Sequence, residues 1–342
     1  MIKVAALANQ GGIMNNQNSP CRGLGGIVFL GTPDFAVAAL DALVSAGFNI
    51  VGVVTAPDKP AGRGMKLQQS AVKRYAEDKG LKLLQPEKLK NPEFLQELKL
   101  LNADLHVVVA FRMLPEAVWN MPPMGTINVH ASLLPQYRGA APINWAIING
   151  EKETGVTTFK LQHEIDTGNI LLQEKIAICE DETAGELHDR LKELGAKVLV
   201  STIAGIVNGS IVEQPQSTPN NGQLTIKHAP KIFTDTCEID WNKTVDEVHN
   251  LIRGLSPYPA AFTHINGKLL KVYRSQKEFT KPNTSPGGFE TDNKSFLKFA
   301  CSNGYISVLE LQLEGKKRMN IEDFLRGNKI TNISSAPHEQ SD

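Results

Sequence analysis

Asn128, His130 and Asp166 are the side chains of this sequence whose types and spacing could carry out chemistry. The first two stand at the end of Gly125–His130, a run that follows a Pro-Pro pair and is typical of a short strand. Because residues i and i+2 of a strand point to the same face, both side chains should project together. Asp166, in an Asp-Thr-Gly turn, could reach the same space from another strand. An amide donor, an imidazole and a carboxylate suit acyl transfer through a tetrahedral oxyanion.

Each of these residues also has a plainer interpretation. Polar groups at a strand end often only satisfy neighbouring backbone, and an aspartate before Thr-Gly is a common turn former. Whether the three residues act together depends on the strands and helices that position them.

Short apolar runs alternate with helical patterns over the first two hundred residues. A threonine and a proline precede the helical pattern that ends at Gly47, Ser70 could cap a second helix, and Thr183 begins a long one that ends near Asn208. The alternation predicts a Rossmann-like, doubly wound parallel sheet, in which ligands bind beyond the carboxyl ends of the strands. The expected strands lie at 27–30, 50–55, 104–110 and 125–130.

The bulk composition excludes several classes of protein. The 342 residues suffice for two domains, and a net charge of zero requires any nucleic-acid contact to use a local basic surface. No apolar run approaches the about 20 residues that span a bilayer. The four cysteines are scattered, so we expect neither disulfides nor a metal site, and a cytoplasmic location. Gly23-Leu-Gly-Gly lies before the first strand, which argues against a bound dinucleotide.

Changes in pattern predict the domain organisation. Residues 1–26 should be a disordered extension, 27–212 the catalytic domain and 213–226 a linker. Residues 227–330 contain short strand-like segments separated by Gly- and Asn-containing turns, which predict a small antiparallel β domain, a barrel of the OB-like kind. Residues 331–342 would form a tail.

The motif around the three polar residues resembles that of a known family. Asn128-Val-His130, the run Ser-Leu-Leu-Pro-Gln-Tyr-Arg-Gly-Ala-Ala-Pro over 132–142, and Asp166-Thr-Gly168 are together similar to the folate-dependent formyltransferases, in particular those that act on methionyl-tRNA. The resemblance extends from about residue 27 to about residue 330. It implies a transferase whose donor cosubstrate is 10-formyltetrahydrofolate, with no tightly bound cofactor, and whose acceptor is the methionine α-amino group of initiator Met-tRNA, as used in translation initiation.

The resemblance also implies roles for individual residues. Asn128 and His130 would stabilise the oxyanion, and Asp166 would orient the imidazole and a water that relays a proton. The residues matching the folate-binding segments are Ser132, Leu133, Leu134, Pro135 and Phe111. Around Phe111 the chain departs from the commoner Ala-Tyr-Gly pattern, and His163 is a poor catalytic choice.

Two basic segments would bind the acceptor stem of the tRNA. The loop over residues 57–67 resembles an insertion that enters the acceptor end, and its Pro and Gly content predicts an extended, mobile segment. The second segment lies in the C-terminal domain, where Trp241 and Tyr258 should pack the domain rather than touch RNA. The predicted cationic contacts are Lys59, Arg63 and Lys66 in the loop, and Lys268, Lys271 and Arg274 in the domain.

Two rival functions remain open at this stage. A related enzyme that formylates a small amine, such as a nucleotide sugar, would not need the basic loop or the basic C-terminal domain. A non-enzymatic RNA-binding protein would not need Asn128, His130 and Asp166. Neither DNA nor a membrane is expected as a partner.

Overall fold

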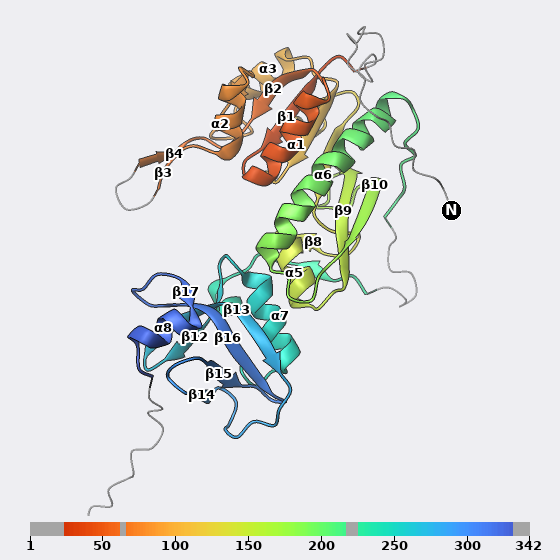
Figure 1. The fold of residues 1–342 in the computed structure, drawn as a ribbon. Helices are drawn as coiled ribbons and strands as arrows, with labels where there is room; N and C mark the ends of the chain where they lie inside the picture. Colours follow the sequence, from red (N-terminus) through yellow and green to blue (C-terminus); the bar gives the residue numbers. More distant parts are fainter. Residues whose placement is uncertain (1–23, 62–65, 217–224, 331–342) are drawn as a thin grey trace, which may run out of the picture.

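The structure is a computed structural model, which describes residues 24–61, 66–216 and 225–330. The first domain is built on a seven-stranded sheet with the order β10-β9-β7-β6-β1-β2-β5 (Figure 1). Five strands are parallel, and β9 runs antiparallel to both β7 and β10. This mostly parallel sheet confirms the predicted α/β fold class. The strands are β1 (Ile27–Gly31), β2 (Ile50–Val54), β5 (Leu83–Leu84), β6 (Leu105–Val109), β7 (Thr126–His130), β9 (Glu153–Lys160) and β10 (Ile170–Ala177).

Helices cover both faces of this sheet, which explains the unbroken apolar runs of its central strands. Ile27 and Phe29 of β1 belong to a core beneath α1 (Asp34–Ser45), α2 (Ala71–Asp78) and α6 (Ala184–Val207). Val28 and Leu30 point to the opposite core, beneath α3 (Pro92–Leu100) and α4 (Glu116–Trp119). Alternate residues of one strand thus enter two different cores, so no position of β1 can be polar.

The helix starts agree with their sequence signals, with one small difference. Ser70 caps α2 by accepting a hydrogen bond from the Lys73 N–H, and Thr183 forms a full capping box with Glu186 at the start of α6. Helix α1 begins at Asp34 with Pro33 as its N-cap, one residue later than a Thr32 cap would give. No helix in the described ranges is long and apolar enough to cross a membrane.

The structure describes the two ends of the basic loop expected between β2 and α2. Its two ends pair as the short antiparallel strands β3 (Lys59–Ala61) and β4 (Lys66–Gln68), where an extended, mobile loop was predicted. This pair projects away from the sheet (Figure 1). Arg63 lies outside the described residues.

The second domain is an antiparallel sheet with the order β12-β13-β16-β15-β14, and β17 pairs with β16. Its order is linear, so among the described strands it forms a half-barrel, packed against α7. The core includes Trp241, which stacks on Phe299 with ring centroids 4.6 Å apart. The elements are η1 (Thr234–Cys237), α7 (Val245–Leu255), β12 (Ala261–Ile265), β13 (Lys268–Glu278), β14 (Phe289–Thr291), β15 (Leu297–Ala300), β16 (Tyr305–Leu313), β17 (Met319–Asn320) and α8 (Ile321–Gly327).

The segment that enters the second domain is part of the first domain's structure. Strand β11 (His228–Ala229) pairs in parallel with β8 (Arg138–Gly139), and Ala229 belongs to the core beneath α1 and α6. Residues 227–230, which the sequence analysis assigned to the second domain, thus pack on the first domain. Residues 217–224 of the predicted linker lie outside the described ranges.

Several hydrogen bonds join the two domains. The Asn144 side chain, on α5 (Pro142–Ile148), donates to the Gly254 carbonyl over 2.7 Å. The Gly185 N–H donates to the Ser256 carbonyl over 3.0 Å. Arg253, which is buried, donates to the carbonyls of Cys179 (3.3 Å) and Glu182 (3.2 Å). These contacts fix α7 against the start of α6.

Candidate functional site

Strand β7 carries the two polar side chains that the sequence analysis singled out. Asn128 and His130 are separated by one residue and so share a face of the strand, as its period of two requires. His130 is buried, whereas Asn128 is half-buried. No hydrogen bond links the side-chain amide of Asn128 to another described residue, so the two N–H groups of that side chain are free for a ligand.

The imidazole of His130 is held at one nitrogen and open at the other. Nε2 lies 2.9 Å from the Tyr137 carbonyl, and because a carbonyl only accepts, Nε2 carries the hydrogen. Nδ1 faces Oδ2 of Asp166 across 4.0 Å, which is ion-pair range but beyond a hydrogen bond. A reacting group or a water can therefore approach Nδ1 beside the carboxylate.

Asp166 is positioned by two hydrogen bonds and by the tight turn in which it lies. Its Oδ2 accepts the Gly139 N–H over 3.0 Å, and its carbonyl accepts the Gln216 side-chain amide over 2.8 Å. Its φ of +54° is in the left-handed region, which costs about 1 kcal/mol for a non-glycine residue. Gly168 closes the turn, since a Cβ there would lie 1.6 Å from the Lys160 carbonyl oxygen. Only glycine permits this packing.

The loop after β7 holds the predicted folate-binding residues. Ser132 is buried and donates to the Gln136 carbonyl over 2.7 Å, and Thr157 on β9 accepts from the Leu134 N–H over 3.1 Å. The Leu134 side chain is only 3% exposed, which leaves little surface for a ligand. Leu133, Pro135 and Phe111 are half-buried and keep accessible surface.

The predicted cationic contacts differ in how exposed they are and in whether a carboxylate already pairs with them. Lys59 and Lys268 are exposed, and Lys271 is half-buried. Arg274 is already engaged, because its guanidinium lies 2.5 Å from Glu186 at the start of α6. This ion pair links the two domains and was not anticipated. Lys66 lies on β4, and Arg63 is outside the described residues.

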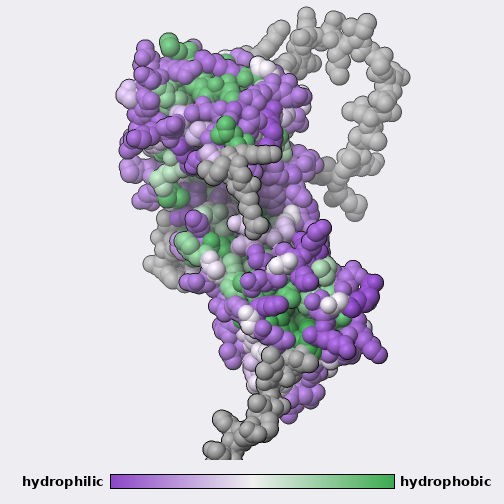
Figure 2. Space-filling view, turned by 90° about the vertical axis from the view of Figure 1, so that its left-hand side faces the viewer, coloured by the Kyte–Doolittle hydropathy of each residue, from purple (hydrophilic) through white to green (hydrophobic). Residues whose placement is uncertain are grey.

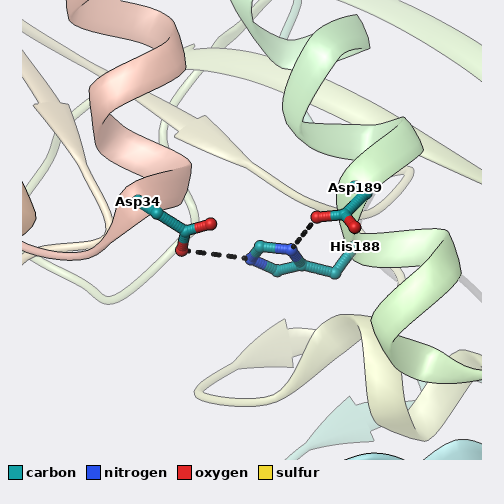
Figure 3. A group of neighbouring side chains, drawn as sticks. All are labelled: Asp34, His188 and Asp189. Carbon is teal, nitrogen blue, oxygen red and sulfur yellow. Dashed lines mark hydrogen bonds and ion pairs between the residues drawn. The ribbon is translucent and has the colours of Figure 1, made fainter.

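Sequence reasoning also missed a polar cluster between α1 and α6. Figure 3 shows His188 between two carboxylates, with Nδ1 3.3 Å from Asp189 and Nε2 4.0 Å from Asp34. One ligand atom from each residue could reach a common metal ion. Lys192, however, already places its ammonium 3.4 Å from Asp34 and 3.2 Å from Asp189. A cation would have to displace that lysine, so the cluster acts as an electrostatic contact between two helices.

The carboxyl ends of the parallel strands face the second domain in Figure 1. Figure 2, viewed at a right angle to Figure 1, shows the surface hollowed between the upper and lower parts of the molecule. β7 is one of these parallel strands, so Asn128 and His130 lie toward its carboxyl end.

Two family models match the chain: one for formyl transferases over residues 26–203, and one for the formyl transferase C-terminal domain over residues 231–329. The methionyl-tRNA formyltransferase of Bacteroides fragilis is 53% identical over 311 residues, which are 89% of this chain and 95% of that protein. The same enzyme of Parabacteroides distasonis is 54% identical over 309 residues, with the same shares covered.

Solved structures give the same fold at lower identity. The sugar 3N-formyl transferase WlaRD, crystallised with dTDP and 5-N-formyl-THF, superposes with a TM-score of 0.62 at 23% identity, over 85% of this chain and 98% of that one. An N-formyltransferase from Helicobacter canadensis, in complex with folinic acid and dTDP-3-aminofucose, gives 0.62 at 21% identity, over 86% and 99%. The chain belongs to the formyl transferase family and, within it, to the methionyl-tRNA formyltransferases.

Proposed function

We propose that this protein transfers the formyl group of 10-formyltetrahydrofolate to the α-amino group of initiator methionyl-tRNA. The amine nitrogen attacks the formyl carbon, and the bond between that carbon and N10 of the folate breaks. The amine loses a proton and N10 gains one, so the products are N-formylmethionyl-tRNA and tetrahydrofolate. Identity above 50% to methionyl-tRNA formyltransferases over nine tenths of the chain supports this acceptor.

The observation that carries the catalytic assignment is the meeting of three side chains at one sheet edge. Asn128 and His130 share a face of β7, and Asp166 approaches His130 Nδ1 to 4.0 Å from a different loop. The Asn128 amide donates to the formyl oxygen as negative charge develops there. His130, held at Nε2, donates from Nδ1 to the same oxyanion when its ring carries both hydrogens. Asp166 orients the ring and a water that accepts the amine proton.

The substrates enter from opposite sides of this edge in our proposal. The folate lies against the loop after β7, near Leu133, Pro135 and Phe111, while the acceptor stem of the tRNA lies along the β3–β4 pair and the second domain. Because the product serves translation initiation, we place the reaction in the cytoplasm, where initiating ribosomes are. DNA and membranes have no part in it.

A sugar N-formyltransferase is the main alternative, because such enzymes share the fold. The β3–β4 pair and the cations of β13 favour the tRNA acceptor, since a small amine needs neither. Transfer of labelled formyl to methionyl-tRNA, compared with free methionine and an amino sugar nucleotide, separates the alternatives. Transfer to the sugar but not to the tRNA would overturn the proposal.

Variants at the site test the assigned roles. Asn128→Ala and His130→Ala should each lower kcat by about 10²–10³-fold, as loss of one oxyanion donor does elsewhere, and leave tRNA binding intact. His163→Ala is the matched control, because His163 is exposed and near in sequence to Asp166 but has no role here. Turnover close to that of the control in either variant would refute its role.

A further inference from the structure

Tyr258 is the most exposed large hydrophobic side chain of the described residues, at 82%. It was expected to pack the second domain together with Trp241. Trp241 does pack, donating its indole N–H to Thr263 over 3.0 Å within the core. Tyr258 instead projects from the short connection between α7 and β12. An exposed aromatic ring with no described packing partner calls for a different function.

The backbone on both sides of Tyr258 is fixed where the two domains meet. Before it, the Ser256 carbonyl accepts the Gly185 N–H over 3.0 Å, and Gly185 lies so close that a Cβ would be 2.6 Å from Pro257 Cδ. After it, the Pro259 carbonyl accepts from the Lys271 ammonium over 3.3 Å. The ring is thus presented from a rigid backbone, which lowers the entropic cost of binding a flat ligand.

The charges along β13 divide into two groups. Arg274 pairs with Glu186, and Lys277 pairs with Glu180 at 2.8 Å and Asp246 at 3.0 Å, so their charge is neutralised by carboxylates. Lys268 and Lys271, at the other end of the strand, form no ion pair with any described carboxylate. The available positive charge therefore lies at the end of β13 that contacts the Tyr258 connection.

We propose that Tyr258 stacks on an unpaired base of the acceptor arm of the tRNA, while Lys271 and Lys268 bind neighbouring phosphates. A fixed aromatic face beside unneutralised cations is the combination by which proteins bind single-stranded nucleotides without reading their sequence. This inference rests on the proposed function and adds a contact at the junction of the domains.

The test compares three variants of the full-length enzyme. Tyr258→Ala should raise KM for methionyl-tRNA about fivefold to a hundredfold, the range expected for loss of one stacked base, with KM for the formyl donor unchanged. Tyr258→Phe keeps the ring and should stay within about twofold of wild type. Phe279→Ala is the matched control, since Phe279 is 62% exposed but lies beside the neutralised Lys277.

Salt dependence separates stacking from phosphate contact. A plot of log binding constant against log salt concentration has a negative slope. Lys271→Gln should make that slope less steep by about 0.7–0.9, because one fewer counterion is released. Tyr258→Ala should weaken binding and leave that slope unchanged. Both are measured by titrating labelled tRNA at several salt concentrations.

Several outcomes would overturn the inference. An unchanged tRNA KM in Tyr258→Ala, or an equal loss in Tyr258→Phe, would exclude stacking by the ring. A rise in donor KM as large as that for tRNA would place Tyr258 on the folate side. A wild-type enzyme that transfers no formyl to tRNA refutes the proposed function instead, and the binding titrations still test the stacking contact.

Discussion

His106 should make the first domain lose stability in mild acid. This residue lies on β6 beside β7, is only 1% exposed, and has an Nδ1 atom without a hydrogen-bond partner among the described residues. Burial lowers the pKa of His106 to about 4 from an ordinary 6.5, and the Val118 carbonyl offsets only part of that shift. The folded protein therefore keeps the ring neutral, while the unfolded chain protonates it below about pH 6.5.

The sign and size of the effect follow from proton linkage. Between pH 6.5 and 4 the unfolded state binds more protons than the folded state, so unfolding free energy falls as the pH falls. Each pKa unit of difference corresponds to about 1.36 kcal/mol. The fall in pKa from 6.5 to about 4 therefore lowers the unfolding free energy by about 3.4 kcal/mol once the pH is well below both values. Between pH 7.5 and 4.5 the loss should be about 2.5 kcal/mol.

Urea unfolding at these two pH values measures this loss. Trp119, in α4 next to Val118, reports on the relevant domain by its fluorescence. His106→Leu removes the titrating group and should lose about 2.5 kcal/mol less than wild type over the same interval. His163→Leu, at an exposed position, should behave as wild type. If His106→Leu loses as much stability in acid as wild type, the buried ring does not carry the penalty and the reasoning fails.

Two further substitutions test the packing around the site and between the domains. Gly168→Ala should lower kcat at least about tenfold with tRNA binding retained, because a Cβ 1.6 Å from the Lys160 carbonyl oxygen must displace the turn that carries Asp166; steady-state kinetics near wild type would contradict this. Arg253→Met should lower the unfolding free energy by about 3 kcal/mol, since the buried Glu182 carbonyl and the Cys179 carbonyl lose a charged donor. Denaturant unfolding measures the loss, and Arg326→Met, at an exposed arginine, is the control; equal stability of the two variants would argue against the interdomain role.

The sequence predicted the parts of the fold that depend on local pattern. Runs such as 27–30 and 104–110 are apolar at every position because both faces of their strands are buried, and that pattern alone indicates a central parallel strand. Thr183 and Ser70 began helices as expected, since capping is a local interaction. The two-residue strands β8 and β11 escaped prediction, because so short a pairing has no periodicity to detect.

For the site too, the sequence predicted what depends on local pattern and not what depends on distant contacts. The shared face of Asn128 and His130 follows from the period of a strand, but the Tyr137 carbonyl that holds His130 is a backbone group with no sequence signal. The pairing of Arg274 with Glu186 joins residues 88 positions apart, so the charge pattern of β13 alone could not show it. Tyr258 was expected to pack, but it is 82% exposed, and its neighbour Pro257 lies against Gly185 in the other domain.

The pairing of β8 with β11 affects how the protein can be divided for experiment. The Tyr137 N–H donates to the Lys227 carbonyl over 2.6 Å, and the Ala140 N–H donates to the Ala229 carbonyl over 2.7 Å. A truncated chain that stops at residue 226 would remove both acceptors from the peptide segment whose carbonyl anchors the His130 ring. A shortened enzyme should therefore be cut after residue 230. For the same reason, the backbone that leads into the second domain is joined by two hydrogen bonds to the loop that orients the imidazole.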